Sequence, residues 1–334
     1  MEDRLFINKG EDFELDLQEN IELNERHELV LLENKLQGSY VSPIINSNKF
    51  KDLVYSWNAE TPDGTEIEFS IQVIKDDIWS KWFSYGKWSS NGNRGSIKGQ
   101  SDDIASMDID TLTIFGEEGA RGFRYKIEIT RDRIDTESPI VKGVWVALNL
   151  IEKISPALDE SKNWIVELDV PVRSQMVIPN IGNIICSPTS VSMVMEYYGQ
   201  KIDTEEVADS VLDNGAEIYG NWSYNVAYAG SKGFTAYVDR FSSVDDIKDK
   251  ISDGIPVIAS IRTKTQKELH GSPSAYPSGH LLVVRGFTVK NGEEYIIVND
   301  PAAPDHDTVR REYKLSEFEN SWSNIVYILT LDSK

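Results

Sequence analysis

The sequence is poor in the residues that build covalent and metal-bound frameworks. Its 334 residues include one cysteine, Cys186, and four histidines. A single thiol excludes an internal disulfide and any metal site built from several cysteines, because both need at least two. With 40% hydrophobic and 10% aromatic residues, the chain still has enough apolar side chains for more than one core. We therefore expect a multidomain protein without disulfides, cofactor or metal.

Positive charge and long apolar runs are also scarce. Asp and Glu number 55 against 34 Lys and Arg, and the net charge of −21 is spread over both halves of the chain. Such a surface repels nucleic acid and anionic membranes. No apolar run approaches the ~20 residues of a membrane span. The first residues lack the basic and apolar regions of a signal peptide. We expect no nucleic-acid partner, no membrane span, and a protein that is cytoplasmic or exported with its signal removed; the oligomeric state stays open.

Residues 1–155 have the pattern of β-strands. Apolar and polar residues alternate most clearly at 65–73 and 123–129. Shorter segments of the same kind occupy residues 53–57, 111–115 and 141–148. Gly- and Asn-containing turns separate these segments. Short strands at this spacing predict an accessory all-β domain, a jelly-roll-like antiparallel sandwich of about 8–10 strands.

Residues 156–334 combine helices with strands. After a polar junction around Pro156, a helix pattern with an early proline ends at Gly199. Further helix patterns occupy residues 204–209, 222–232 and 243–254, and strand patterns occupy residues 255–261, 281–287, 295–298 and 325–331. Helices followed by an antiparallel sheet are typical of an α+β domain. The domain boundary is therefore expected at 155/156.

Three reactive side chains occur in the second part in a fixed order. Cys186 directly precedes a helix pattern, His280 precedes an apolar strand, and Asp300 ends the next strand. A helix N-terminus lowers the pKa of a thiol, and its free amides can hold an oxyanion. The turn Asn291-Gly292 predicts a hairpin that brings the strand of Asp300 beside that of His280. An acceptor there would orient the imidazole.

Gln175 and Asn299 extend this candidate site. Gln175 lies eleven residues before Cys186, where a side-chain amide can be a second oxyanion donor. Asn299 is an alternative to Asp300, because neighbours on a strand point to opposite faces and only one should face His280. Each residue alone has an ordinary interpretation, such as a buried cysteine, a surface histidine or a turn. Their joint order on these elements indicates a thiol hydrolase.

The segments that carry these residues resemble the peptidase C39-like family. The matching motifs, in chain order, are VPVRSQ (170–175), CSPTSVSMVMEYYG (186–199), NWSYNVA (221–227), GIPVIA (254–259), SGHLLVV (278–284) and VNDPA (298–302). The resemblance covers residues 165–332 and does not reach the first 150 residues.

The resemblance implies a papain-like cysteine peptidase fold for residues 156–334 of a bacterial protein. Cys186 would be the nucleophile, His280 the general base, Asp300 the orienting acid and Gln175 the oxyanion glutamine. The implied reaction is hydrolysis of a peptide or amide bond, with a peptide or amide substrate that includes cell-wall or peptide-derived compounds. No cofactor is implied.

Two differences from the family limit what the resemblance implies. Ser187 follows the cysteine where many relatives have glycine, and it is expected to crowd the approach of a substrate. The chain has no transporter segment, so the double-glycine leader specificity of the best-studied relatives is not implied. Two other functions remain open: acyl transfer to an amine by the same thiol, and a catalytically inactive peptide- or glycan-binding module.

Two sequence features lie outside this interpretation. The run WSKWFSYGKW at residues 79–88 can stack on sugar rings or a peptide, or fill the core of the β domain. Asp305-His306-Asp307 has metal-ligand residue types, but no further ligands follow at a recognisable spacing. A solvated acidic loop is the favoured interpretation of that tripeptide.

Overall fold

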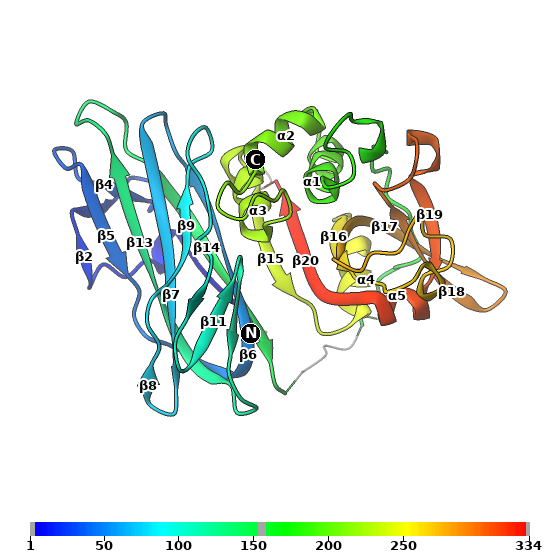
Figure 1. Ribbon diagram of the computed structural model, residues 1–334, viewed down its shortest axis with the longest axis horizontal. Helices are drawn as coiled ribbons and strands as arrows, with labels where there is room; N and C mark the ends of the chain where they lie inside the picture. Colours follow the sequence, from blue (N-terminus) through cyan, green and yellow to red (C-terminus); the bar gives the residue numbers. More distant parts are fainter. Residues whose placement is uncertain (1–3, 153–157, 160, 332–334) are drawn as a thin grey trace. The chain divides into compact units, whose positions relative to one another are not determined.

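The computed structural model describes residues 4–152, 158–159 and 161–331 (Figure 1). The chain divides into two compact units. The first comprises Met1–Lys153 and Leu212–Gly233, and the second comprises Ile154–Val211 and Phe234–Lys334. The boundary expected at 155/156, with its junction residue Pro156, lies outside the described residues.

The first unit is mostly β, with antiparallel pairing between the strands described (Figure 1). Its described strands are β1 (Leu5–Lys9), β2 (Gln18–Glu19), β3 (Ile21–Leu23), β4 (Leu29–Leu31), β5 (Gln37–Val41), β6 (Ile45–Glu60), β7 (Thr65–Lys75), β8 (Ile78–Trp79), β9 (Phe83–Trp88), β10 (Gln100–Ser101), β11 (Ala105–Asp108), β12 (Thr111–Ile114), β13 (Ala120–Arg131) and β14 (Ile140–Leu150). The five strand segments predicted from alternation lie in β6, β7, β12, β13 and β14, so those predictions are confirmed.

Two long strands connect the pairs into one network. β6 pairs with β12, β13 and β14, and β13 pairs with β5, β6 and β7. The register of β13 against β6 shifts between Ala120 and Gly122. A Cβ at Gly122 would lie 2.9 Å from the backbone oxygen of Ile45, so a residue without a side chain is needed where the strands approach.

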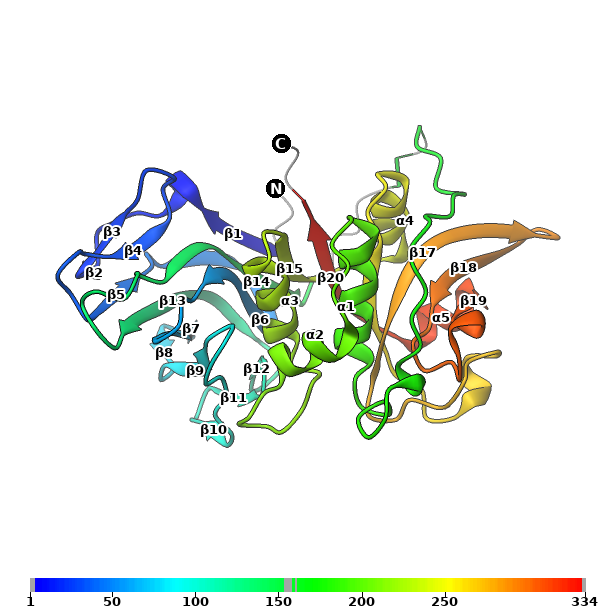
Figure 2. The same cartoon turned by 90° about the horizontal axis from the view of Figure 1, so that it is seen from above.

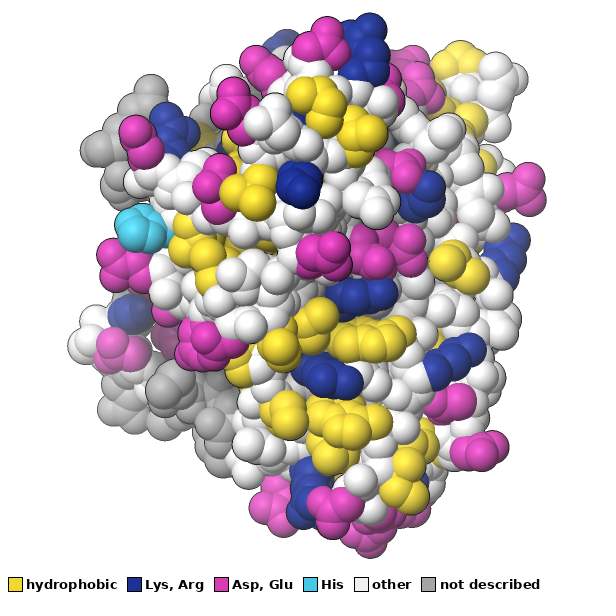
Figure 3. Space-filling view, turned by 90° about the vertical axis from the view of Figure 1, so that its left-hand side faces the viewer, with side chains coloured by type: hydrophobic (Ala, Val, Ile, Leu, Met, Phe, Trp, Pro, Cys, Tyr) yellow, Lys and Arg dark blue, Asp and Glu magenta, His cyan; other side chains and the backbone are white. Residues whose placement is uncertain are grey.

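The tryptophans of residues 79–88 have two different environments. Trp88 is fully buried in the aromatic core. Trp79 and Trp82 are half-buried, and both rings lie close to Arg124, whose guanidinium carbon is 4.9 and 5.3 Å from their centroids. Hydrophobic and basic side chains also alternate over the centre of the face drawn in Figure 3. These cations occupy ring surface that a stacked sugar would need.

Helix α3 (Trp222–Ser231), predicted from sequence as 222–232, completes the core of this first unit. The Asn221 side chain caps the helix by accepting from the backbone N–H of Tyr224. The ring of Tyr224 lies 5.2 Å from that of Trp88, and its hydroxyl donates to the backbone oxygen of Tyr85 at 3.0 Å. The helix therefore shares both apolar packing and buried hydrogen bonds with the β-strands.

A buried carboxylate fixes the start of the same helix. Asp110, in the turn between β11 and β12, accepts a hydrogen bond from the backbone N–H of Trp222 at 2.6 Å. Burial raises the pKa of Asp110 to about 7, even though the donors Trp222 and Thr111 favour the charged form. Folding therefore favours the protonated carboxyl at mildly acidic pH.

Asp110→Asn should make the first unit less sensitive to rising pH. The native state binds the Asp110 proton more tightly than the unfolded state, so wild type loses stability as pH rises from about 4 to about 7, by at most about 4 kcal/mol. Asparagine keeps an acceptor for Trp222 and does not titrate. We measure the urea midpoint by tryptophan fluorescence at pH 4.5 and at pH 8. Relative to wild type, the midpoint of the variant should be higher at pH 8 than at pH 4.5. The exposed Asp103→Asn serves as control, and an equal difference at both pH values would contradict the account.

The second unit is built on an antiparallel sheet with the order β15-β20-β16-β17-β18-β19. Its strands are β15 (Thr235–Arg240), β16 (Val257–Ile261), β17 (His280–Lys290), β18 (Glu293–Asn299), β19 (Arg310–Lys314) and β20 (Trp322–Thr330). Its α-helices are α1 (Cys186–Tyr197), α2 (Thr204–Val211), α4 (Val244–Ser252) and α5 (Leu315–Ser321), several of which can be followed in Figure 2. Asn291 and Gly292 have φ values of 54° and 80°, which confirms the predicted hairpin between β17 and β18.

Alternation along the strands divides the second unit into two packed layers. One set of sheet residues, including Val257, Leu282 and Val298, joins α4 and α5 in a single core. Residues of the opposite parity face α1, as the contact between Ser187 Oγ and the Tyr327 hydroxyl at 3.0 Å indicates. The sequence predicted α1, α2, α4 and four of the six strands, but not β15, β19 or α5. Within the described residues, no helix is both long and apolar enough to cross a bilayer.

Candidate active site

Cys186 is the first residue of α1 rather than the residue before it. Ile185 is the N-cap, and Thr189 Oγ1 donates back to the Ile185 carbonyl at 2.7 Å. The thiol itself is half-buried. The first turn of a helix has backbone N–H groups without intrahelical partners, and its dipole favours negative charge. The local structure therefore stabilises a thiolate at this position.

His280 begins β17, an inner strand of the sheet, and lies at the end of that strand beside α1. Its side chain is only 4% exposed. Its Nε2 lies 2.8 Å from Asp300 Oδ1, and its ring is close enough to Cys186 for each group to shift the pKa of the other. Because Nε2 is engaged with the carboxylate, Nδ1 is the ring nitrogen left for the thiol. The structure thus brings Cys186, His280 and Asp300 together, with His280 hydrogen-bonded to the carboxylate and next to the thiol.

Asp300 directly follows β18 and is completely buried. Oδ1 accepts from His280 and from the backbone N–H of Ala302 at 3.0 Å. Oδ2 accepts from the hydroxyls of Tyr276 and Tyr313 at 2.9 and 2.8 Å. Both carboxylate oxygens therefore have two donors, which offsets the cost of removing the charge from water.

Asn299 faces away from His280. Its Nδ2 donates to the carbonyls of Val170 and Pro171 at 3.2 and 3.0 Å, and its Oδ1 accepts from Arg285 at 3.1 Å. Of the two alternatives that the sequence left open, Asp300 is the one hydrogen-bonded to the imidazole.

The three titratable groups shift one another's pKa values toward the charged forms. Burial raises the pKa of the Cys186 thiol, but the hydrogen bond and charge of His280 lower it below its ordinary value. Burial lowers the pKa of His280, but Asp300 and Cys186 raise it to about 10. Burial raises the pKa of Asp300, and His280, Tyr313 and Tyr276 together lower it below its ordinary value. The arrangement favours a thiolate–imidazolium pair beside an ionised carboxylate.

The two tyrosines are site residues that sequence reasoning missed. The ring of Tyr276 also stacks on His280, with centroids 4.0 Å apart and planes 8° from parallel. They lie 24 and 13 residues from Asp300 in the sequence, in a loop and in the unpredicted strand β19. No local pattern marks them, because a hydroxyl's partner across a fold leaves no periodic signal.

Gln175 begins a 3₁₀ helix, Gln175–Val177, and its side chain is 3% exposed. Its backbone N–H donates to the carbonyl of Pro301, the residue after Asp300, at 2.9 Å. Its Oε1 is buried without a hydrogen-bond partner among the described residues. A buried amide left partly unpaired is unusual in a folded protein and is a feature of functional sites.

Ser187, the departure from the family pattern, is completely buried. Its Oγ lies 3.0 Å from the hydroxyl of Tyr327 on β20. The side chain is therefore directed toward the sheet rather than into solvent beside the thiol.

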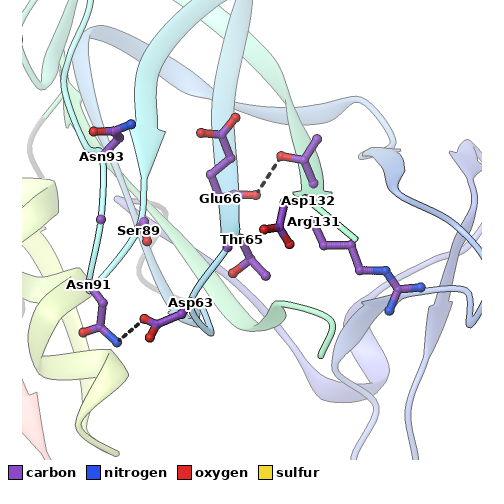
Figure 4. A pocket seen from close by; sticks show the side chains of 11 residues that line it. Asp63, Thr65, Glu66, Ser89, Asn91, Asn93, Arg131 and Asp132 are labelled. Atoms are coloured by element: carbon purple, nitrogen blue, oxygen red, sulfur yellow. Dashed lines mark hydrogen bonds between the residues drawn. The ribbon is translucent and has the colours of Figure 1, made fainter. Parts of the chain in front are cut away.

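A cavity of the first unit contains none of the candidate site residues. This cavity, of about 460 Å³, is lined by residues of β7, β13 and neighbouring turns, among them Asp63, Glu66 and Asp132 (Figure 4). The Arg131 guanidinium points away from it and donates to the backbone carbonyls of Lys35 and Thr136. Throughout the part of the chain that the structure describes, no group of three His, Cys, Asp or Glu side chains is arranged to hold a metal ion.

Two family models match the chain. Residues 167–329 match the peptidase C39-like family, and residues 14–148 match the peptidase C39 N-terminal domain. The first match confirms the resemblance inferred from the sequence motifs. The second identifies the N-terminal part, which sequence reasoning did not recognise. None of the curated proteins matches the chain.

Several solved structures are similar to the C-terminal part. A double glycine motif protease from an AMS/PCAT transporter, solved with its leader peptide, is 21% identical, with a TM-score of 0.35 over 54% of this chain and 100% of its own. A C39-like peptidase from Bacillus anthracis is 16% identical, with a TM-score of 0.39 over 51% of this chain and 98% of its own. The peptidase domain of Streptococcus ComA is 17% identical, with a TM-score of 0.33 over 46% and 97%.

The two family matches, one to each part of the chain, are the basis of the family assignment. A mostly β N-terminal region precedes a papain-like C-terminal region. Residues 167–329 belong to the peptidase C39-like family, and the protein is a cysteine-type peptidase.

Proposed function

We propose that this protein hydrolyses a peptide or amide bond through the triad Cys186, His280 and Asp300. The observation that carries the proposal is the His280 imidazole, which lies next to the Cys186 thiol and is hydrogen-bonded to the buried Asp300 carboxylate at 2.8 Å. Burial alone would leave both the thiol and the imidazole neutral. Their mutual stabilisation as charged groups is the condition for a thiol to act as a nucleophile near neutral pH.

In the first chemical step the Cys186 thiolate attacks the substrate carbonyl carbon. The C–S bond forms as the carbonyl π-electrons move onto oxygen, which becomes the oxyanion. The Cys186 backbone N–H, at the start of α1, and the Gln175 side-chain amide donate to that oxyanion. The donor of this amide is Nε2, and the side chain is almost completely buried, which limits the positions it can take.

In the following steps His280 moves the protons. The imidazolium gives its Nδ1 proton to the leaving amine as the C–N bond breaks, and an acyl-enzyme thioester remains. The neutral imidazole then takes a proton from water, which attacks the thioester and releases the acid. Asp300 stays ionised throughout. It accepts a hydrogen bond from the Nε2–H of His280 and further hydrogen bonds from Tyr276 and Tyr313.

We assign the catalytic role to residues 156–334 and an accessory role to residues 1–155. The N-terminal region, which we class as a jelly-roll-like β-sandwich, contributes no residue of the triad. Its strands share a core with α3, a helix that lies within residues 156–334 of the sequence. The N-terminal region therefore stabilises this helix. The proposed substrate is a peptide, and no nucleic acid is involved.

Cys186→Ala should abolish hydrolysis of a pool of fluorogenic tripeptide amides, because it removes the nucleophile. Tyr295→Phe, which alters a hydroxyl bonded to the exposed Glu293, is the matched control and should keep wild-type activity. Added amines separate hydrolysis from acyl transfer, since a transferase would form amine conjugates that mass spectrometry detects. Hydrolysis that survives in Cys186→Ala would contradict the proposed function.

Tyr313→Phe and Tyr276→Phe should lower activity to a similar extent. Each removes one donor from Asp300 Oδ2, and hydrogen bonds to a buried charge contribute about 2 kcal/mol. We expect kcat to fall about 10-fold with little change in KM, and the urea midpoint to fall as well. Tyr276→Leu also loses the stack on His280 and should be worse than Tyr276→Phe. Wild-type kcat in both phenylalanine variants would show that the hydroxyls do not support Asp300.

A further inference from the structure

The segment that carries Gln175 is tied to the loop that follows Asp300. The Gln175 N–H donates to the Pro301 carbonyl at 2.9 Å, and Ser174 Oγ donates to the Ala303 carbonyl at 2.5 Å. A third bond runs from the Ser174 N–H to the imidazole Nδ1 of His306 at 2.9 Å. One short loop thus holds both the orienting carboxylate and the oxyanion segment.

The His306 bond is the only one of the three made by a side chain of that loop. Its geometry requires Nδ1 to be an acceptor, so the ring is neutral with its proton on Nε2. His306 begins a 3₁₀ helix, His306–Thr308, whose N-cap Asp305 accepts from the backbone N–H of Thr308 at 3.0 Å. The tripeptide Asp305-His306-Asp307 therefore has a structural use in which the imidazole faces the backbone of Ser174.

On the other side of Gln175, the Ile178 N–H donates to the Gln175 carbonyl at 3.1 Å, and the two residues between them are exposed. Met176 and Val177 are each 47% exposed. The Met176 N–H is bonded to Ser174 Oγ at 3.1 Å, so even this contact leads back to Ser174. The position of the Gln175 amide consequently depends on how Ser174 is held.

We propose that His306 is a positioning residue for the oxyanion amide of Gln175, acting through Ser174. It makes no described hydrogen bond to Cys186, His280 or Asp300, so it does not belong to the triad. The inference rests on the proposed function, because it presumes that Gln175 donates to an oxyanion. A shift of about 0.5 Å in such a donor is enough to weaken transition-state stabilisation.

The test compares three variants at this position. Asn Oδ1, like His Nδ1, is bonded directly to Cγ, so His306→Asn keeps an acceptor near the same place. His306→Gln and His306→Ala do not. With the tripeptide amide pool, we expect kcat to fall about 10-fold in His306→Ala and His306→Gln, with KM nearly unchanged, and to stay within about 2-fold of wild type in His306→Asn.

Two further measurements distinguish positioning from a general loss of structure. The rate of Cys186 alkylation by iodoacetamide forms no oxyanion and should be unchanged in all three variants. In a Gln175→Ala background, His306→Ala should cost nothing further, because both changes act on one donor.

The outcomes separate this inference from the proposed function. Equal kcat in all three His306 variants and wild type, with hydrolysis abolished by Cys186→Ala, overturns the role of His306 and leaves the proposed function standing. Additive losses in the double variant also overturn it. Hydrolysis that persists in Cys186→Ala overturns both.

Discussion

The arrangement of the catalytic unit depends on one buried charge, the carboxylate of Asp300. A carboxylate with no exposure to water is strongly unfavourable unless its oxygens are paired. Here each oxygen accepts two hydrogen bonds, from His280 and the Ala302 backbone on one side and from Tyr276 and Tyr313 on the other. Satisfying these four donors requires β17, β18, β19 and the loop before β17 to meet at one corner of the sheet. The imidazole is oriented as a result of the same pairing.

Two adjacent residues at the end of β18, Asn299 and Asp300, hold different parts of the site. Asn299 holds the backbone of Val170 and Pro171, which leads to Gln175, while Asp300 holds His280. Strand alternation places the two side chains on opposite faces, so each can be held without interfering with the other. The loop after Asp300 then binds Ser174 and Gln175. The proposed general base and the proposed oxyanion donor are thus positioned from the same short stretch of chain.

The sequence predicted features that have a local or periodic signature. The strands β6, β7, β13, β16 and β17 follow from alternation or apolar runs, and the hairpin at Asn291-Gly292 follows from residues that accept positive φ. Cys186, His280 and Asp300 could be selected because each occupies the end of a predicted element. Tyr276, Tyr313 and His306 could not, since their partners lie 24, 13 and 132 residues away and only the tertiary structure brings them together. The sequence likewise did not show that α3 belongs to the core of the first unit, because only the tertiary structure brings α3 to those strands.

The pH dependence of Cys186 alkylation by iodoacetamide tests the central claim most directly, because the chain has one thiol. In wild type, the rate should reach its plateau below the ordinary thiol pKa of about 8.5, since His280 holds the charge that stabilises the thiolate. In His280→Ala, burial remains without the imidazolium, so the profile should move to the ordinary pKa or above it. Asp300→Asn should lie between the two, because the pKa of His280 falls without the carboxylate. An ordinary thiol profile that is the same in wild type and in His280→Ala would contradict the account.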